Sequence, residues 1–451
     1  MEAGGQSTIV IIGAGPCGIA CGRELERLGH QDWLILERAG HAGGLASSVS
    51  DPAGFTWDLG GHVVFSHFGE FDALLADSMG DQILQHERSS YVRFAGRWVP
   101  YPFQNNLRYL PEEVTADCLE GLADAPGGDS KMDFATWMRS VFGEGITRHF
   151  MAPYNFKVWA TPPGEMACDW IAERVSVVDY ERAAANVRDG RDDIAWGPNN
   201  TFVFPAFGGT GEIYTRIAAR MKDRIRYDRE VVGVDPRERT LQVASGERYG
   251  YGSLVSTAPL DQLVGWLGDC PDPLRSAAAK LRHNGVYMVG VGYEQPLADE
   301  KSWMYFPQDH APFYRATNFA KYSPANVPGS EVSRYCAYMT ETSFSPEKPV
   351  QRDGLEDRVE QGLRDAGVVA GRPPVASLHL EQIDYAYPVP TLERDQALQT
   401  LQPWLMERGI YSRGRFGSWR YEIGNMDHAV KMGVDIARRL VRGDEEALWP
   451  R

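Results

Sequence analysis

The sequence predicts an α/β fold in which a Rossmann-like domain carries an inserted helical domain and a mostly antiparallel β-sheet domain. Three observations support this fold class. Residues 8–38 read as strand, glycine-rich turn, helix and strand, residues 109–150 have helical periodicity, and β-rich aromatic segments follow between residues 285 and 340. At 451 residues the chain is also long for one hydrophobic core, so two or three domains are expected.

The elements follow in chain order. "TIVII" at 8–12 is typical of a buried parallel strand, "PCGIACGRELERLG" at 16–29 of a helix, and "DWLILER" at 32–38 of a second strand. Residues 224–259 predict short strands that return to a sheet, and residues 425–443 predict an amphipathic helix.

The domain boundaries follow from these elements. Residues 109–150 predict helices interrupted by acidic and glycine-rich stretches, with a loop at 123–131, "ADAPGGDSK". We expect a discontinuous Rossmann-like domain, a mobile helical domain and an antiparallel sheet domain. Their residues are 1–108, 201–290 and 388–451 for the first, 109–200 for the second and 291–387 for the third.

The composition excludes several classes of protein. The net charge of −15 argues against a nucleic-acid binder, although local arginines can still hold an anionic substrate in one cleft. The sequence contains no apolar run of the ~18 residues that a membrane span needs, and no basic segment that would begin a secretory signal. Six scattered cysteines without a CxxC pair predict buried free thiols and a cytoplasmic location.

A glycine-rich turn gives the first sign of a cofactor. Gly13, Gly15 and Gly18 have GxGxxG spacing between the first strand and its helix, where backbone N–H groups bind a pyrophosphate. Glu37 ends the second strand, where an acid accepts the ribose hydroxyls of an adenosine. The turn therefore predicts a dinucleotide, and a tight turn without a nucleotide is the less favoured alternative.

A second glycine pair favours FAD over a nicotinamide cofactor. Gly43 and Gly44 precede Leu45 and follow Arg38, and amine-oxidase-type FAD enzymes carry such a pair. The chain has only one GxGxxG motif, so we expect no separate NAD(P)H domain. Arg38 alone is typical of a solvated surface charge, and Val232 is a candidate neighbour of the adenine that packing explains equally well.

The stretch "DLGGHVVFSH" at 58–67 raises a question about its first histidine. Gly60 and Gly61 indicate that the backbone comes close to another group or adopts a conformation that a Cβ forbids. His62 is then an acid–base, a metal ligand, or a residue whose backbone matters. No partner ligands lie nearby at metal-binding spacing, so we predict no metal site.

Several longer stretches resemble a known family along essentially the whole chain. They resemble UDP-galactopyranose mutases, in particular the eukaryotic-type branch. The stretches are "GGLASS", "DLGGHVVFSH", "YVRFAGRWVPYPFQNN", "APYNFKVWATP", "CDWIAERV", "WGPNNTFVFPAFGGTGEI", "YFPQDHAPFYRATNFAKYSP", "YPVPTLER" and "SRGRFGSWRYEIGNMDH".

The resemblance implies an isomerase that interconverts the pyranose and furanose forms of a nucleotide-linked hexose, by default UDP-galactose. In the family, N5 of reduced FAD attacks the anomeric carbon and displaces the nucleoside diphosphate without net redox. The Gly60–Gly61–His62 turn then lies against the flavin, where a backbone carbonyl accepts the N5 hydrogen of the reduced state. This implication favours a backbone role for the His62 turn and a structural role for His67.

The resemblance also implies which residues hold the substrate. Arg174 and Arg315 align with the arginines that bind the pyrophosphate, although the sequence around Arg174 alone favours a surface ion pair worth under ~1 kcal/mol. Other aligned residues contact phosphate (Tyr305, Tyr322, Tyr387, Tyr421), uracil (Tyr101, Phe103, Gln104, Phe150), ribose (Asn155, Trp159), the flavin and sugar (Asn199), or the flavin (Arg415, Asn425, Met426).

Three departures from the family pattern leave alternatives open. Met426 stands where the eukaryotic branch usually has Gln, Phe207 replaces an Arg, and Tyr385 replaces a His. The same chemistry on a GDP- or other nucleotide-linked hexose, for example in natural-product biosynthesis, is therefore the main alternative. An amine oxidase or desaturase of the same fold and a non-catalytic flavoprotein are less favoured.

The source of electrons and the assembly state remain open in the sequence. Some family members are reduced directly by NADPH, and without a second GxGxxG motif such binding would use the substrate cleft. A homo-oligomer is possible.

Overall fold

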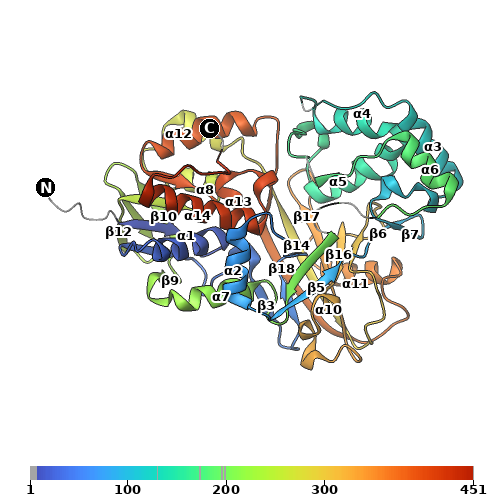
Figure 1. Cartoon of the computed structure of the whole chain (residues 1–451), viewed down its shortest axis with the longest axis horizontal. Coiled ribbons are helices and arrows are strands. Elements are labelled where there is room, and N and C mark those ends of the chain that lie inside the picture. The colour runs from blue at the N-terminus through green and yellow to red at the C-terminus, as the bar shows by residue number, and fades with distance from the viewer. Residues whose placement is uncertain (1–7, 130, 172–173, 195–196, 198–199, 450–451) are drawn as a thin grey trace.

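The computed structural model describes residues 8–129, 131–171, 174–194, 197 and 200–449. They form three parts, which Figure 1 shows as a parallel-sheet part on the left, a helical part at the upper right and an antiparallel part at the lower right. All six cysteines are buried and free, as predicted.

The parallel-sheet part contains the predicted βαβ opening. Its strands, in spatial order, are β19 (Ile410–Ser412), β13 (Ser253–Ser256), β1 (Ile9–Ile12), β2 (Trp33–Leu36) and β9 (Ile225–Arg226). All neighbouring pairs in this sheet are parallel. β10 (Val231–Asp235), β11 (Thr240–Val243) and β12 (Arg248–Gly250) form a small antiparallel sheet beside it.

Helices cover both faces of the parallel sheet. Ile9 and Ile11 pack on one side and Val10 and Ile12 on the other, because successive side chains of a strand point to opposite faces. The first side is covered by α1 (Pro16–Arg27), α2 (Gly69–Met79), α7 (Gly211–Arg220) and α14 (Met426–Arg442). The second is covered by α8 (Leu260–Gly265), α9 (Asp272–Ala278) and α12 (Arg394–Met406).

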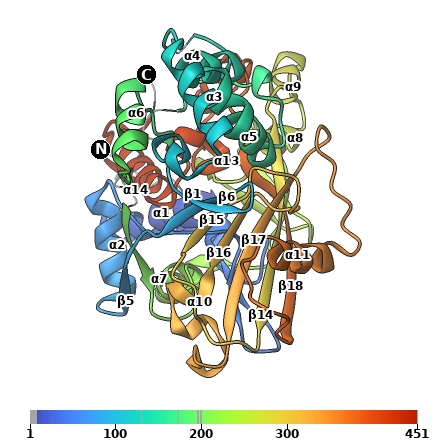
Figure 2. The ribbon, with the colours of Figure 1, turned by 90° about the vertical axis from the view of Figure 1, so that its right-hand side faces the viewer.

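The antiparallel part is a seven-stranded sheet. Its order is β18 (Val375–Pro388), β14 (His283–Tyr293), β17 (Cys336–Phe344), β16 (Arg315–Asn318), β15 (Trp303–Tyr305), β6 (Ser90–Phe94) and β7 (Arg97–Pro100). Only the β15–β6 pair is parallel. α11 (Leu355–Asp365) covers one face, as Figure 2 shows from the side, and an aromatic cluster that includes Phe55 and Trp57 packs on the other.

Short strands and one short helix connect this sheet to the rest. β3 (Ser48–Ser50) pairs with β4 (Thr56–Asp58), and β5 (Ile83–Glu87) pairs with β8 (Thr201–Pro205). α10 (Phe319–Tyr322) follows β16 directly.

The helical part consists of α3 (Glu112–Ala123), α4 (Phe134–Ile146), α5 (Ala152–Trp159) and α6 (Tyr180–Asp189), with a π-helical turn at Thr147–Met151. Its core also includes Val92 and Val99 of the β6–β7 hairpin, so the helices sit on one edge of the seven-stranded sheet.

The predicted fold class is confirmed, with a parallel Rossmann-like sheet, a helical insertion and a mostly antiparallel sheet. Helix continues to Trp159, within the expected helical domain 109–200. Residues 90–100, which we expected within the segment 1–108, pair with the seven-stranded sheet.

Candidate active site

One cavity of about 790 Å³ lies where the three parts meet. Its walls include Gly13 and Glu37 from the parallel-sheet part, Trp159 from the helical part, and Tyr305 and Arg315 from the antiparallel part. One end of the cavity, lined by Gly13 and Glu37, lies at the carboxyl ends of β1 and β2. Open parallel sheets bind nucleotides at this position.

The glycine turns at this end have the geometry of a pyrophosphate site. Gly13 has a φ of +97°, which favours glycine, and Gly15 lines the cavity at the N-terminus of α1. A Cβ on Gly44 would come 3.1 Å from the Cα of Gly15, so the two glycine motifs touch. Gly18 and Gly43 do not line the cavity. A Cβ on Gly18 would come 1.9 Å from the oxygen of Gly13, and Gly43 donates its N–H to the oxygen of Ala14 at 2.9 Å.

Glu37 lies at the end of β2 as predicted. Its Oε2 accepts the N–H of Ala14 at 2.6 Å and its Oε1 accepts the N–H of Ala39 at 2.8 Å. The carboxylate is thereby fixed at the cavity wall, where it can accept hydrogen bonds from ribose hydroxyls. Leu45 and the exposed Arg38 also line this end, whereas Val232 is an exposed side chain and its neighbour Val231 lines the cavity instead.

This end fits FAD. The close approach of Gly15 and Gly44 leaves no room for side chains where a pyrophosphate would lie, and the helix N-terminus supplies N–H donors. Gly60, Gly61, His62 and the arginines Arg174 and Arg315 line the same cavity, so a dinucleotide bound at the glycine turns shares one space with them.

We expect Gly18→Ala to lose most of its bound FAD. The new Cβ would overlap the Gly13 oxygen and push α1 away from the turn, at a cost of about 1–3 kcal/mol in the free energy of unfolding. The measurement is the flavin absorbance per protein after purification. Gly164→Ala is the matched control, because a Cβ there meets nothing within 4 Å. Equal FAD content in the two variants would contradict the prediction.

The Gly60–His62 turn lies at the centre of the cavity. The N–H of Gly61 donates to Oε1 of Glu341 at 2.6 Å, and the N–H of His62 donates to the oxygen of Gly60 at 2.7 Å. The His62 side chain is 27% exposed, and it lines the cavity. Burial lowers the pKa of His62 to about 4, against the opposing charge of Glu341, so the imidazole is neutral at pH 7.

The low pKa of His62 predicts a pH-dependent stability. Between its ordinary pKa of about 6.5 and the folded value of about 4, the unfolded chain binds a proton that the folded protein does not. Stability is therefore lost as the pH falls through this window, by about 2 kcal/mol at pH 5. Urea unfolding at pH 7 and pH 5 should show a smaller loss in His62→Gln than in the unchanged protein. The exposed His41→Gln should behave like the unchanged protein, and the same loss in all three would refute the assignment.

Arg315 and Glu341 form a buried ion pair beside this turn. Arg315 Nη2 lies 2.6 Å from both carboxylate oxygens of Glu341, and Nε lies 3.1 Å from Oε1. Burial alone would raise the pKa of Glu341, but Arg315, the Tyr314 hydroxyl and the Gly61 N–H together lower it. Arg315 is thus a permanently charged, oriented cation in the cavity wall.

Arg174, on the segment that follows α5, is a second arginine of the cavity wall. Its Nη2 donates to the backbone oxygen of Glu422 at 2.8 Å, its Nη1 lies 3.4 Å from Oδ1 of Asn425, and its guanidinium lies 4.6 Å above the Tyr421 ring. The residue lines the cavity and does not form a surface ion pair among the described residues. Two arginines therefore face one space, as the resemblance predicts.

Aromatic side chains line the end of the cavity away from the glycine turns. Tyr101 packs on Tyr305 with ring centroids 5.0 Å apart, and Phe150 stacks on Tyr154 at 5.3 Å. The amide of Gln104 donates to the oxygen of Ser176, which leaves its Oε1 without a hydrogen-bond partner among the described residues. The remaining predicted residues that line this end are Asn155, Trp159, Tyr387 and Tyr421.

The N-terminus of α14 faces the middle of the cavity. Asn425 and Met426 line it, together with Arg415, whose Nη1 donates to the oxygen of Gly424 at 2.7 Å. Nearby, the described residues include one group of potential metal ligands, formed by His67, Asp427 and His428. Nδ1 of His67 and Nδ1 of His428 lie 2.7 and 3.0 Å from the two oxygens of Asp427, so the three side chains form a hydrogen-bonded unit.

Two predicted substrate residues lie outside the cavity. Phe103 is fully buried and stacks behind Phe150 with centroids 4.6 Å apart. Tyr322 is fully buried in the cluster that contains Phe204 and Phe319. Asn199, predicted near the flavin and sugar, lies outside the described residues.

The three departures lie at different distances from the cavity. Met426 and Tyr385 line it, and the Tyr385 hydroxyl donates to Oδ2 of Asp261 at 2.7 Å. Phe207 is 38% exposed and packs under the guanidinium of Arg216, away from the cavity. The Phe207 departure therefore does not bear on the substrate directly.

Several cavity residues were not predicted from the sequence. Glu341 is opposite Arg315 in the β16–β17 register, so pairing of these two strands would have identified it. Others include Arg88, Gln262 and Trp266, which lie in no stretch that carries the resemblance, and Tyr154 and Tyr314, which lie in such stretches but were not singled out.

Known proteins share this architecture. The flavin containing amine oxidoreductase family matches residues 16–441. A crystal structure of reduced UDP-galactopyranose mutase aligns with a TM-score of 0.94 and 38% identity, over 98% of this chain and 95% of that chain. The chain belongs to the UDP-galactopyranose mutase family.

Two further solved structures share the fold with this mutase-family chain. A fatty acid isomerase from P. acnes aligns with a TM-score of 0.65 and 16% identity, over 96% of this chain and 98% of that one. Cyclohexylamine oxidase from Brevibacterium oxydans aligns with a TM-score of 0.69 and 16% identity, over 97% and 99%. No helix in the described part of the chain is long and apolar enough to cross a membrane.

Proposed function

We propose that this chain is a flavin-dependent nucleotide-sugar mutase that interconverts the pyranose and furanose forms of a nucleoside-diphosphate hexose. UDP-galactopyranose and UDP-galactofuranose are the default pair. The observation that carries the proposal is that one cavity is lined by glycine turns suited to FAD, by Arg174 and Arg315 and by several tyrosines. A dianionic ligand between two arginines suits this wall better than an amine or a hydrocarbon does.

The chain's own residues would bind and orient the reactants. When bound and reduced, FAD supplies the nucleophile for the anomeric carbon. Arg174 and Arg315 would hold the diphosphate before and after it separates from the sugar, and their fixed charges would stabilise the leaving group. Tyr305, Tyr387 and Tyr421 would donate hydroxyl hydrogens to phosphate oxygens while their rings exclude water.

The nucleotide base and the Gly60–His62 turn can also be assigned partners in the cavity. The buried Oε1 of Gln104, once a side-chain shift exposes it, would accept a ring N–H, which uracil offers at N3. Tyr101 would provide a stacking surface, and Phe150, whose ring is already covered by Phe103 and Tyr154, would support the pocket from behind. His62 is neutral at pH 7, so it would place no charged imidazole beside the flavin.

Turnover by the reduced protein tests the proposal. Dithionite-reduced protein should convert UDP-galactofuranose to UDP-galactopyranose, and air-oxidised protein should not. Conversion of only GDP- or dTDP-linked hexoses in the same assay would favour the alternative substrate class. Oxygen consumption in proportion to product, with no isomerised sugar, would refute the mutase and favour an oxidoreductase.

We further propose that the protein belongs to the eukaryotic-type branch, acts in the cytoplasm and forms a homo-oligomer. NADPH is a candidate reductant that would enter the substrate cleft. It should therefore compete with the nucleotide sugar in a binding titration, whereas simultaneous binding of both would exclude a shared cleft.

A further inference from the structure

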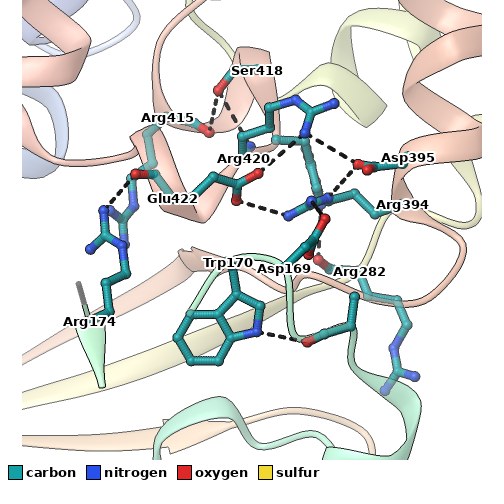
Figure 3. A network of polar contacts seen from close by, with 12 residues as sticks. Asp169, Trp170, Arg174, Arg282, Arg394, Asp395, Arg415, Ser418, Arg420 and Glu422 are labelled. Atoms are coloured by element: carbon teal, nitrogen blue, oxygen red, sulfur yellow. Dashed lines mark hydrogen bonds and ion pairs between the residues drawn. The ribbon is translucent and has the colours of Figure 1, made fainter. Parts of the chain in front are cut away.

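Arg394 is a buried cation that lies outside the cavity. It begins α12, and its side chain is 1% exposed. Nη1 lies 3.0 Å from Oε2 of Glu422, Nε lies 3.0 Å from Oδ1 of Asp395, and Nη2 lies 3.4 Å from Oδ2 of Asp169. Figure 3 shows this guanidinium between the three carboxylates. Burying such a charge is unfavourable unless its partners are fixed, so the network has a defined geometry.

One partner of Arg394 belongs to the segment that leads to Arg174. The backbone around Asp169 is attached to the chain before α12, because the N–H of Ala167 donates to the oxygen of Pro390 at 2.8 Å. The next residue, Trp170, lines the cavity and packs edge-on against Tyr421, with ring centroids 5.5 Å apart. Asp169 thus connects Arg394 to the cavity wall.

The other main partner, Glu422, holds Arg174 directly. Its backbone oxygen accepts a hydrogen from Arg174 Nη2 at 2.8 Å, while its carboxylate binds Arg394. The preceding residue, Tyr421, lies under the Arg174 guanidinium at 4.6 Å. One contact of the Arg174 guanidinium is therefore made by a residue that Arg394 binds, and a second is made by the residue next to it in the chain.

We propose that Arg394 is a positioning residue that orients Arg174 toward the diphosphate of the substrate. It acts through the Glu422 carboxylate and the Asp169 segment, and together with Arg420, which pairs with Glu422 and Asp395, it neutralises carboxylates that would otherwise repel an anion. The fork of an arginine is required, because a lysine ammonium cannot reach three separated carboxylates in one plane. This inference rests on the proposed function, since it needs a diphosphate as the ligand of Arg174.

Binding of phosphate ligands to the reduced FAD-containing protein tests the inference. The probes are UDP, inorganic pyrophosphate (which has no base) and uridine (which has no phosphate). We expect Arg394→Gln to raise the Kd of UDP and of pyrophosphate about tenfold and to change the Kd of uridine less than twofold. KM for the nucleotide sugar should rise in parallel, with a smaller change in kcat. Arg408→Gln is the matched control and should leave all values unchanged. Arg408 follows the same helix, and its guanidinium stacks on Trp404.

A double-mutant cycle separates positioning from general destabilisation. In the Arg174→Ala background, Arg394→Gln should have less than a twofold effect on UDP binding, because its target is gone. Equal effects in both backgrounds, or tenfold weaker binding of uridine, would overturn the inference. If Arg394→Gln does not fold, Asp169→Asn provides the same cycle with an expected threefold effect on UDP, and an unchanged Kd there would also overturn it. A wild-type protein that binds neither UDP nor pyrophosphate would instead refute the proposed function.

Discussion

Arg315→Lys should lower kcat/KM for the nucleotide sugar by about 10²- to 10³-fold, mainly through KM. In the folded protein, Nε and Nη2 of Arg315 are used by Glu341, and Nη1 is not part of that ion pair. A lysine ammonium can neutralise Glu341 or reach the diphosphate, but its single nitrogen cannot do both in a fixed orientation. The substitution also leaves the buried Glu341 carboxylate less completely paired, so the free energy of unfolding should fall by roughly 1–3 kcal/mol. Steady-state kinetics and urea unfolding measure the two effects.

Two further variants separate catalysis from stability at Arg315. Arg352→Lys, at an exposed position, is the matched control and should change neither value. Adding Glu341→Gln to Arg315→Lys removes the incompletely paired carboxylate and should restore part of the stability without restoring kcat/KM. Near-normal kcat/KM in Arg315→Lys would show that this guanidinium does not grip the substrate.

The parallel-sheet part was predictable because its signals are local. The strand, turn and helix of residues 9–27 follow from apolar runs and glycine spacing within a few residues. The pairing of β6 with β15 was not predictable, because the two strands are about 210 residues apart and no local pattern selects the partner.

The same contrast holds for the site. Arg174 and Arg315 were identified through the resemblance, and both line the cavity. Glu341 was missed because its role depends on the antiparallel register that places it opposite Arg315. Val232 was chosen where Val231 lines the cavity, since a one-residue shift on a strand moves the side chain to the other face. Tyr322 lies in a stretch that carries the resemblance, but its ring packs in the core and not in the cavity.

Gly61→Ala should weaken UDP binding and lower kcat/KM by about 10²-fold. A Cβ at this position would come 2.8 Å from Oγ1 of Thr317, 3.0 Å from Oε1 of Glu341 and 3.3 Å from Nε1 of Trp303. Glu341 also accepts the Gly61 N–H at 2.6 Å, so a carboxylate that shifts away from the methyl weakens this bond or its contact with Arg315. Overpacking of this kind costs about 1–3 kcal/mol, and here the displaced group is the one that orients Arg315.

Gly60→Ala is the matched control for this prediction, because it changes the neighbouring glycine of the same turn. A Cβ on Gly60 meets nothing closer than Nε2 of His62 at 3.6 Å, which is ordinary contact. Its Kd for UDP should therefore stay within about threefold of the unchanged protein, while that of Gly61→Ala rises. Equal UDP affinities in the two variants would mean that the turn is not coupled to Arg315 through Glu341. A rise confined to Gly61→Ala would link the backbone turn on the flavin side to the cation on the diphosphate side through one buried carboxylate.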